Sequence, residues 1–243
     1  MNNWEFYNIL ESHYDEMIDF ESSLKKKIEY LHSFIEPEFR MGLDLGCGTG
    51  ADSIALSKLG LNVRALDHSV KMIQKAKSNA KNHGAEIKFS EIELTEIILN
   101  DGYYDFIVSL GNTLANLSGK YLKILFGKLE KGLSICGRIV IQIINYARFP
   151  NSGEYVLNRL ENNDISIVRR YMFHDKGVEF IIDINDKKND QKNNLVTKIF
   201  PHSLEFLIEL ANHNNLNYEI FGNLKKESYL KDQSENIVMV LSK

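Results

Sequence analysis

The sequence predicts an α/β protein built on a mostly parallel β-sheet. From Met41 onward, short apolar runs bounded by glycine alternate with helical patterns, which is typical of parallel strands joined by crossover helices. The chain has 243 residues, of which 44% are hydrophobic, so one large core with an embellishment is expected. A glycine-rich turn over residues 46–50 separates the first apolar run from the helix that follows it.

Composition argues against several classes of protein. The 29 Lys and Arg residues against 33 Asp and Glu residues give a net charge of -4, so no basic field is available to hold a nucleic acid. The most apolar stretch, Ile139–Ile144, is far shorter than the ~20 residues of a membrane helix. The N-terminal segment carries acids where a signal peptide is basic and then apolar. Cys47 and Cys136 lie far apart, and the 7 histidines show no ligand spacing. We therefore expect a cytoplasmic protein that binds no nucleic acid, membrane or metal.

The expected elements follow in chain order. Residues 1–36 have apolar positions at three- and four-residue spacing and are interpreted as an N-terminal helical lid, which Pro37 ends. Residues 37–243 are expected to form the main domain. Its helices are expected at 51–59, 70–81, about 121–129 and 203–211, and its strands at 41–45, 61–66, 86–89, 104–110, 133–144, 216–221 and 237–241.

An insertion with β character is expected at about 151–200. Residues 165–173 and 178–184 flank His174-Asp175-Lys176-Gly177, whose composition is typical of a hairpin turn. The polar run Asn185–Asn194 is interpreted as an exposed, solvated loop, and residues 195–200 as a further strand. Additions to an open α/β sheet lie over the carboxyl ends of its strands, where ligands bind, so the insertion is expected to bear on substrate choice. The alternative is that the hairpin over residues 165–184 is a dimer surface.

Residues 43–51, Leu-Asp-Leu-Gly-Cys-Gly-Thr-Gly-Ala, carry the strongest functional signal. Glycines between a strand and a helix let the backbone turn tightly and approach a ligand, and the helix N-terminus adds free N–H groups. Asp67 ends the second strand, where a carboxylate accepts hydrogen bonds from the two hydroxyls of a ribose. Together these features predict a site for a nucleotide-like ligand.

Two ligands compete for this site. Gly46, Gly48 and Ala51 satisfy the G-x-G-x-x-G/A pattern of NAD(P)-dependent dehydrogenases. A third glycine at Gly50, the acid Asp44 before the loop and the lack of an evident hydride-chemistry residue after the fourth strand favour S-adenosylmethionine. A non-catalytic protein that keeps the cofactor fold is a further alternative.

Residues 44–50, Asp-Leu-Gly-Cys-Gly-Thr-Gly, closely resemble the first motif of class I S-adenosylmethionine-dependent methyltransferases. The resemblance implies a doubly wound, Rossmann-like α/β fold with a seven-stranded, mostly parallel sheet and a β-hairpin insertion before the sixth strand. It implies S-adenosylmethionine as cofactor. The cofactor-binding residues carried over from matching positions are Asp44, Gly46, Cys47, Gly48, Asp67, His68, Met72, Ile92 and Leu110. For Asp44, a structural role within its own loop is an equal alternative.

Three further segments are similar to the glycine and sarcosine N-methyltransferase-like branch of that family: Tyr14-Asp15, Leu110–Leu114 and Asn145-Tyr146. This similarity implies a small-molecule methyl acceptor, methylation at nitrogen, and polar groups near the transferred methyl. The catalytic residues it implies are Tyr14, Asn112 and Tyr146.

Two departures from the family's sequence pattern narrow the range of methyl acceptors that we expect. Enzymes of the branch that methylate glycine use arginines, whereas between Tyr14 and Pro37 this chain has only lysines, Lys25–Lys27, so glycine is not the expected acceptor. Gly111-Asn112-Thr113 stands where base-modifying methyltransferases have Asn or Asp before Pro-Pro, so nucleic-acid bases are not expected either. The oligomeric state stays open between a monomer and a homodimer.

Overall fold

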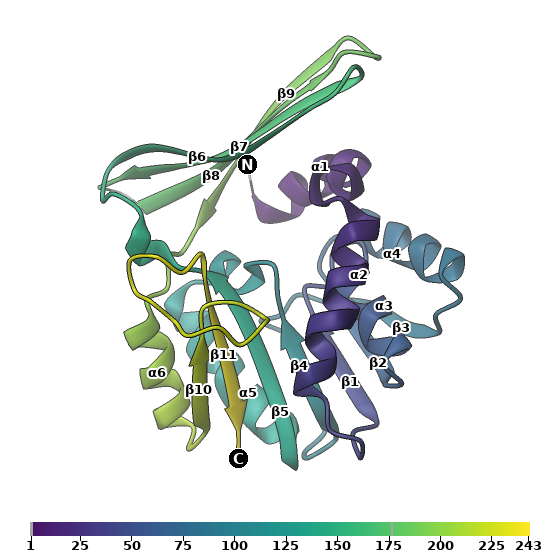
Figure 1. The fold of residues 1–243 in the computed structure, drawn as a ribbon, viewed down its shortest axis with the longest axis vertical. Coiled ribbons are helices and arrows are strands. Elements are labelled where there is room, and N and C mark those ends of the chain that lie inside the picture. The colour runs from purple at the N-terminus through teal and green to yellow at the C-terminus, as the bar shows by residue number, and fades with distance from the viewer. Residues whose placement is uncertain (1, 176) are drawn as a thin grey trace.

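The computed structural model describes residues 2–175 and 177–243, which form two β-sheets with helices around the larger one (Figure 1). The larger sheet has seven strands in the order β10-β11-β5-β4-β1-β2-β3. Strands β1 to β5 are mutually parallel, and β11 is antiparallel to both of its neighbours. The strands are β1 (Met41–Leu45), β2 (Asn62–Asp67), β3 (Ile87–Glu91), β4 (Tyr104–Ser109), β5 (Leu133–Ile144), β10 (Asn217–Phe221) and β11 (Asn236–Ser242). The predicted doubly wound α/β fold with a mostly parallel sheet is confirmed.

Helices cover both faces of this sheet because its central strands are apolar on both sides. Leu45 and Ile107 face one layer and pack with α5 (Gly119–Gly132) and α6 (Leu204–His213). Val63 and Phe106 face the other layer, which contains α2 (Phe20–Leu31), α3 (Ala51–Lys58) and the inner side of α4 (Val70–Asn82). The carboxyl ends of the parallel strands are left free by both layers.

The N-terminal segment forms two helices where the sequence predicts one helical stretch. Helix α1 (Asn3–Ile18) ends at Asp19, whose left-handed backbone (φ 50°) turns the chain into α2. Polar contacts hold α1 against the main domain: the Ser69 hydroxyl donates to Asn8 Oδ1 (2.6 Å), and Asn79 Nδ2 donates to Asp15 Oδ2 (3.0 Å). Helix α2 packs into the core of the main domain through Phe20, Leu24 and Leu31, so of the segment expected to form a lid only α1 lies outside that core.

The insertion forms an antiparallel sheet of four strands, in the order β6-β7-β8-β9, which we call the roof sheet. Its strands are β6 (Gly153–Glu161), β7 (Ile165–His174), β8 (Gly177–Asp186) and β9 (Gln191–Ile199). The predicted hairpin is its central pair, β7 and β8, and Lys176 of the expected turn lies outside the described residues. Strand β9 contains most of the further strand expected at 195–200, so β6 is the strand of the insertion that was not predicted from the sequence.

One prediction for the insertion is wrong. The run Asn185–Asn194 is not a loop, because Asn193 and Asn194 pair with Ile184 and Asp183 across β8 and β9. Backbone hydrogen bonds sustain this pairing whatever the polarity of the side chains, and the polar side chains there are largely exposed at the far end of the sheet. Only the short turn at 187–190 stays outside the strands.

The roof sheet lies beyond the carboxyl ends of the parallel strands, with α1 between the two sheets (Figure 1). Its inner face and α1 share an apolar cluster that includes Phe6, Leu10, Ile167 and Ile182. Asn3 at the start of α1 also accepts a hydrogen bond from the Thr197 hydroxyl on β9. Because α1 contacts both sheets, it closes the space over the strand ends. Within the described residues, every helix is too short or too polar to cross a bilayer.

Candidate active site

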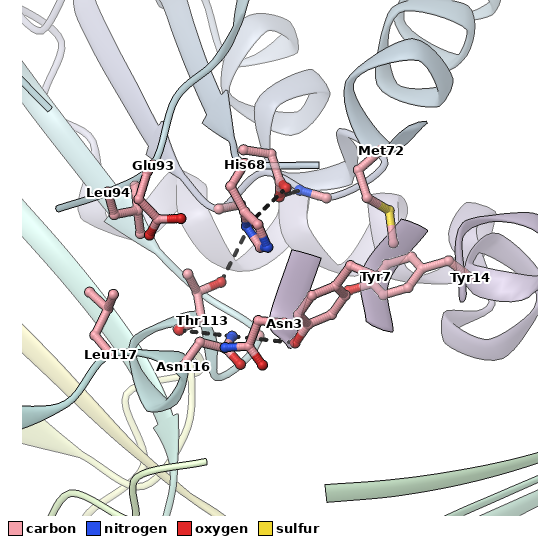
Figure 2. Close-up of a pocket in the computed structure, with 14 residues that line it drawn as sticks. Asn3, Tyr7, Tyr14, His68, Met72, Glu93, Leu94, Thr113, Asn116 and Leu117 are labelled. Atoms are coloured by element: carbon pink, nitrogen blue, oxygen red, sulfur yellow. Dashed lines mark hydrogen bonds and ion pairs between the residues drawn. The ribbon is translucent and has the colours of Figure 1, made fainter. Parts of the chain in front are cut away.

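A cavity with about 680 Å³ of empty space, part of it open to solvent, lies at the carboxyl ends of β1, β2 and β4. Figure 2 shows Tyr7 and Tyr14 entering it from α1, opposite His68, Glu93 and Leu94. The lining residues are Asn3, Tyr7, Tyr14, Gly46, Gly48, Asp67, His68, Met72, Glu93, Leu94, Gly111, Thr113, Asn116 and Leu117.

The glycine loop forms the floor of the cavity. Gly46 has a positive φ (73°), and a Cβ at this position would collide with the side chain of Thr113. Gly48 also has a positive φ (53°), and a Cβ there would lie 3.6 Å from the Tyr14 ring. Glycine is therefore required at Gly46 by both backbone conformation and space, and at Gly48 by conformation with Tyr14 directly above it.

Asp67 ends β2 with its carboxylate buried beside the loop. One oxygen accepts from the backbone N–H of Gly48 (2.9 Å) and the other from that of Ser69 (2.8 Å). Burial raises the pKa of Asp67, while these two N–H groups and nearby His68 act in the opposite direction. Each carboxylate oxygen keeps lone-pair capacity after its single backbone bond, so the group fits the two hydroxyls of a ribose.

Two buried polar atoms at the cavity have no partner among the described residues. These are Nε2 of His68 and Oδ1 of Asn116, and both side chains line the cavity. Buried polar atoms in native proteins normally find a hydrogen-bond partner. Together with the carboxylate of Asp67 and the apolar surfaces of Met72 and Leu94, they fit the adenosine part of S-adenosylmethionine, a planar base with polar edges joined to a ribose.

Two tyrosines of α1 form the wall opposite the loop. Tyr7 and Tyr14 are seven residues apart, about two helical turns, and so share one face of α1. The Tyr7 hydroxyl accepts from Asn116 Nδ2 (3.3 Å), and its ring meets that of His68 edge-on. Burial raises the pKa of Tyr7 to about 12 and that of Tyr14 well above its usual value. Both hydroxyls are therefore neutral hydrogen-bonding groups at physiological pH.

Asn112 and Tyr146 meet each other beside the cavity, under the roof sheet. Asn112 Nδ2 donates to the hydroxyls of Tyr146 (2.8 Å) and Tyr171 (3.5 Å), while Oδ1 accepts from the Ile144 backbone N–H (3.0 Å). Burial raises the pKa of Tyr146 above its usual value, so this hydroxyl too stays protonated. The amide is thus locked in orientation, and it fixes two phenol groups between β4, β5 and β7.

The structure separates the sequence-predicted residues into three groups. Those that line the cavity are Tyr14, Gly46, Gly48, Asp67, His68 and Met72. Asn112 and Tyr146 lie beside it and contact each other. The remaining four, which lie outside the cavity lining, are Asp44, Cys47, Ile92 and Leu110.

Two of the last group have contacts of their own. The Asp44 carboxylate, 1% exposed, accepts a hydrogen bond from the Ser53 hydroxyl (2.5 Å) on α3 and so holds the glycine loop against that helix. The backbone N–H of Ile92 donates to the Asp67 carbonyl (3.0 Å), so it is engaged within the protein, and Glu93 and Leu94 face the cavity instead. The structure thus shows a supporting contact for Asp44, the structural alternative considered from sequence.

Sequence reasoning missed Tyr7, Asn116 and Tyr171. Tyr7 could have been predicted from the sequence, because it lies two helical turns before Tyr14 and therefore on the same face of the helix. Asn116 lies in a short 3-10 turn after β4, and Tyr171 on the inward face of β7, whose alternation of buried residues is visible in the sequence. Their meeting with Asn112 and Tyr146 depends on tertiary placement of the roof sheet. Among the described residues, no cluster of His, Cys, Asp and Glu has the arrangement of a metal site.

Comparison with known proteins agrees with this geometry. Residues 43–134, which contain the glycine loop and Asp67, match a family described as a methyltransferase domain. The fold is similar to that of an S-adenosylmethionine-dependent methyltransferase from Clostridium acetobutylicum, with a TM-score of 0.79, 18% identity, and coverage of 97% of this chain and 98% of that one. Residues 43–134 thus match a methyltransferase domain, and the chain has the fold of the S-adenosylmethionine-dependent methyltransferase from Clostridium acetobutylicum.

Two further structures resemble this methyltransferase domain and its insertion. One is an S-adenosylmethionine-bound amino pentose methyltransferase from Micromonospora echinaspora, with a TM-score of 0.69, 13% identity, and coverage of 92% of this chain and 91% of that one. The other is a sugar N-methyltransferase from Streptoalloteichus, with a TM-score of 0.69, 15% identity, and coverage of 95% and 91%. At these identities the likeness concerns the fold.

Curated relatives match the methyltransferase domain over shorter stretches. Ribosomal protein L11 methyltransferase of Campylobacter fetus is 42% identical over 72 residues, which are 30% of this chain and 26% of the relative. Glycine/sarcosine N-methyltransferase of Halorhodospira halochloris is 29% identical over 109 residues, 43% of this chain and 40% of the relative. The chain therefore spans between about a quarter and two fifths of the length of these relatives.

Proposed function

We propose that this chain is an S-adenosylmethionine-dependent methyltransferase that methylates an amino nitrogen of a small molecule. The observation that carries the proposal is the cavity in which the Asp67 carboxylate and the glycine loop face Tyr7 and Tyr14 of α1. The first two features fit the cofactor, and Tyr14 stands over the loop at Gly48. S-adenosylmethionine bound there would supply a methyl group already activated by its sulfonium.

The enclosure of the site favours a small acceptor. Helix α1 lies over the strand ends, and the roof sheet packs on α1 through Phe6, Leu10, Ile167 and Ile182. These two layers stand over the glycine loop, and such cover favours a small acceptor over a folded protein or a nucleic-acid helix. A small molecule can enter and be enclosed, and enclosure keeps water away from the reacting groups.

The chemistry of the lining favours nitrogen as the acceptor atom. Tyr7, Tyr14, Asn112, Asn116 and Tyr146 are neutral on this side, and none of them is a strong base. The cavity carboxylates, Asp67 and Glu93, stand on the β2–β3 side. A neutral amine brings its own lone pair and needs orientation more than proton removal, and orientation supplies about 7–11 kcal/mol of barrier reduction.

The transfer is balanced without a further reactant. The amine lone pair forms the N–C bond to the methyl as the C–S bond breaks, and the electrons of that bond go to sulfur. The products are S-adenosylhomocysteine and a methylated ammonium, which releases a proton to solvent if a hydrogen remains. The residues of this chain orient the amine through phenol and amide groups and exclude water. The names of the amino pentose and sugar N-methyltransferases with this fold support an amine acceptor.

The proposal is tested by label transfer. The purified protein is incubated with methyl-labelled S-adenosylmethionine and three sets of acceptors: amino sugars and amino acids, their hydroxyl counterparts, and a ribosomal protein fraction. We expect label on small amines. Label confined to the protein fraction would contradict the acceptor class. Binding of NAD with no binding of S-adenosylhomocysteine would contradict the methyltransferase assignment itself.

A further inference from the structure

The inner face of β7 carries one charged residue in an otherwise apolar or phenolic row. Successive strand residues point to opposite faces, so Ile165, Ile167, Arg169, Tyr171 and Phe173 share the face turned toward α1 and the cavity. The other four are buried, and Arg169 is half-buried among them. A cation in this row requires a physical explanation.

Arg169 has no acidic partner among the residues that the structure describes. Its Nε donates to the neutral Oδ1 of Asn158 (2.7 Å) on β6, and no ion pair to a carboxylate is formed. Burial lowers the pKa of Arg169, and of the described groups only the phenols of Tyr14 and Tyr171 act in the opposite direction. Removing a guanidinium from water without an opposite charge is costly, so a missing anion is indicated.

The neighbouring residue in the same strand, Arg170, is an arginine that is paired with carboxylates. Arg170 points to the outer face, where its guanidinium contacts Glu154 (2.7 Å) and Asp183 (2.8 Å). Burial is the largest single effect on the pKa of Arg170 and lowers it, but the two carboxylates together raise this pKa above its usual value. The two adjacent arginines therefore differ in their partners, since the outer one has protein carboxylates and the inner one has none among the described residues.

Arg169 also lies near the groups that surround the transferred methyl in the proposed reaction. Its charge lowers the pKa of the Tyr14 and Tyr171 hydroxyls, against the larger raising effect of burial on both. Tyr14 lies over Gly48, and the Tyr171 hydroxyl accepts from Asn112. Arg169 thus stands next to Tyr171 on the inner face of β7, the face through which the roof sheet meets Asn112 and α1.

We propose that Arg169 binds an oxyanion, a carboxylate or a phosphate, carried by the methyl acceptor. This inference rests on the proposed function and deepens it, because it defines the substrate class as a small amine that also bears an acidic group. The Nη groups of a guanidinium form a planar pair of donors that matches both oxyanions. Asn158 fixes the Nε side and so orients this pair.

The experiment measures binding of charged and uncharged probe pairs to the protein saturated with S-adenosylhomocysteine. The pairs are glycine with glycinamide and phosphoethanolamine with ethanolamine, and acetate and inorganic phosphate serve as anions without an amine. We expect the anionic member of at least one pair to bind more tightly. The Arg169→Gln variant should lose at least about tenfold of that affinity, equivalent to about 1.4 kcal/mol, and Arg169→Lys should lose less. Arg170→Gln is the matched control and should bind as the parent does.

The outcome shows whether Arg169 binds a carboxylate, a phosphate or neither group. Preference for glycine and acetate assigns a carboxylate, and preference for phosphoethanolamine and phosphate assigns a phosphate. Equal affinity of the parent and Arg169→Gln for every anion, or no saturable binding of any anion by the parent, would overturn the inference. Failure of S-adenosylhomocysteine to bind would instead overturn the proposed function, so the two failures are distinguishable.

Discussion

At the scale of single residues, we expect cofactor recognition to depend most on Asp67. Asp67→Asn keeps the size of the group and removes its charge. Because the ribose hydroxyls would lose charge-assisted hydrogen bonds, we expect the affinity for S-adenosylhomocysteine to fall by about 2 kcal/mol, close to thirtyfold. Isothermal titration calorimetry measures this, with the exposed neighbour Glu91→Gln as control. An unchanged dissociation constant would remove Asp67 from the cofactor site.

The buried side chain of Asp44 leads to a prediction of how the stability of the folded protein depends on pH. Burial, with a further contribution from Asp52, raises the pKa of Asp44 to about 8, against the opposing bond from Ser53. The folded protein therefore holds this proton more tightly than the unfolded chain, and the stability it contributes is lost as the pH rises from about 4 through about 8. Asp44→Asn should be more stable than the parent at pH 8 by about 1 kcal/mol or more, and this advantage should shrink at pH 5. Thermal melts at both pH values test it.

The control for this prediction is Asp105, an acid whose pKa is shifted in the opposite direction, below its usual value. The pKa of Asp105 is lowered because the Met41 and Arg40 backbone N–H groups and the Ser134 hydroxyl donate to it, against a raising effect of partial burial. Asp105→Asn should therefore destabilise the protein at neutral pH, and its deficit should shrink in acid. A constant difference between Asp44→Asn and the parent across the pH range would contradict an elevated Asp44 pKa.

Sequence reasoning reached the cofactor side of the cavity better than the acceptor side, for a physical reason. Gly46, Gly48 and Asp67 come from two consecutive strand ends of a parallel sheet, so topology alone brings them together. Tyr7 and Arg169 come from α1 and β7, and their positions depend on how the roof sheet docks on α1. No local pattern encodes that docking.

At the scale of elements, α1 is the part whose behaviour should change most with ligand. It contacts the main domain through few polar bonds, including that of Tyr7 with Asn116 and that of Asn8 with Ser69. A ligand under α1 should hold it in place, so hydrogen exchange of residues 3–18 should slow on addition of S-adenosylhomocysteine. Mass spectrometry of exchanged peptides measures this, and α6 (204–213), remote from the cavity lining, is the internal control.

Equal exchange of α1 with and without ligand would contradict its role as a lid. A slowing shared by α6 to the same extent would indicate general stabilisation with no specific closure. The expected result is confined to α1, the glycine loop and the loop that carries Thr113 and Asn116.

The same scale explains which elements the sequence could predict. The strands and helices of the main sheet have strong periodicity, glycine ends such as Gly60 and a serine cap at Ser69, and the structure places them close to the expected bounds. The residues of the edge strand β6 are exposed or half-buried, and they lack the apolar alternation from which a strand can be predicted. The polar start of β9 was misread for a related reason, because its pairing comes from the backbone.

At the scale of the whole molecule, the chain builds one site from its most distant parts. The glycine loop and Asp67 lie in the first third of the main domain, α1 precedes it, and Arg169 and Tyr171 arrive from the insertion after β5 (Figure 1). Four apolar clusters hold these parts together: one on each face of the large sheet, one between α1 and the roof sheet, and one between the roof sheet and the segments after β4 and β5. We expect an acceptor to enter where the cluster between α1 and the roof sheet opens.

Calorimetric titration of the whole protein with S-adenosylhomocysteine and with NAD tests the central claim most directly. The cavity has a carboxylate, that of Asp67, which fits one ribose, and two buried polar atoms without partners in the described part of the chain, on His68 and Asn116, which fit one base. We therefore predict one saturable site for S-adenosylhomocysteine and none for NAD. At a ligand concentration a hundredfold above the dissociation constant, the stability should rise by about 2.7 kcal/mol and the melting temperature by about 5–10 °C. Saturable binding and stabilisation by NAD, with neither by S-adenosylhomocysteine, would contradict the account.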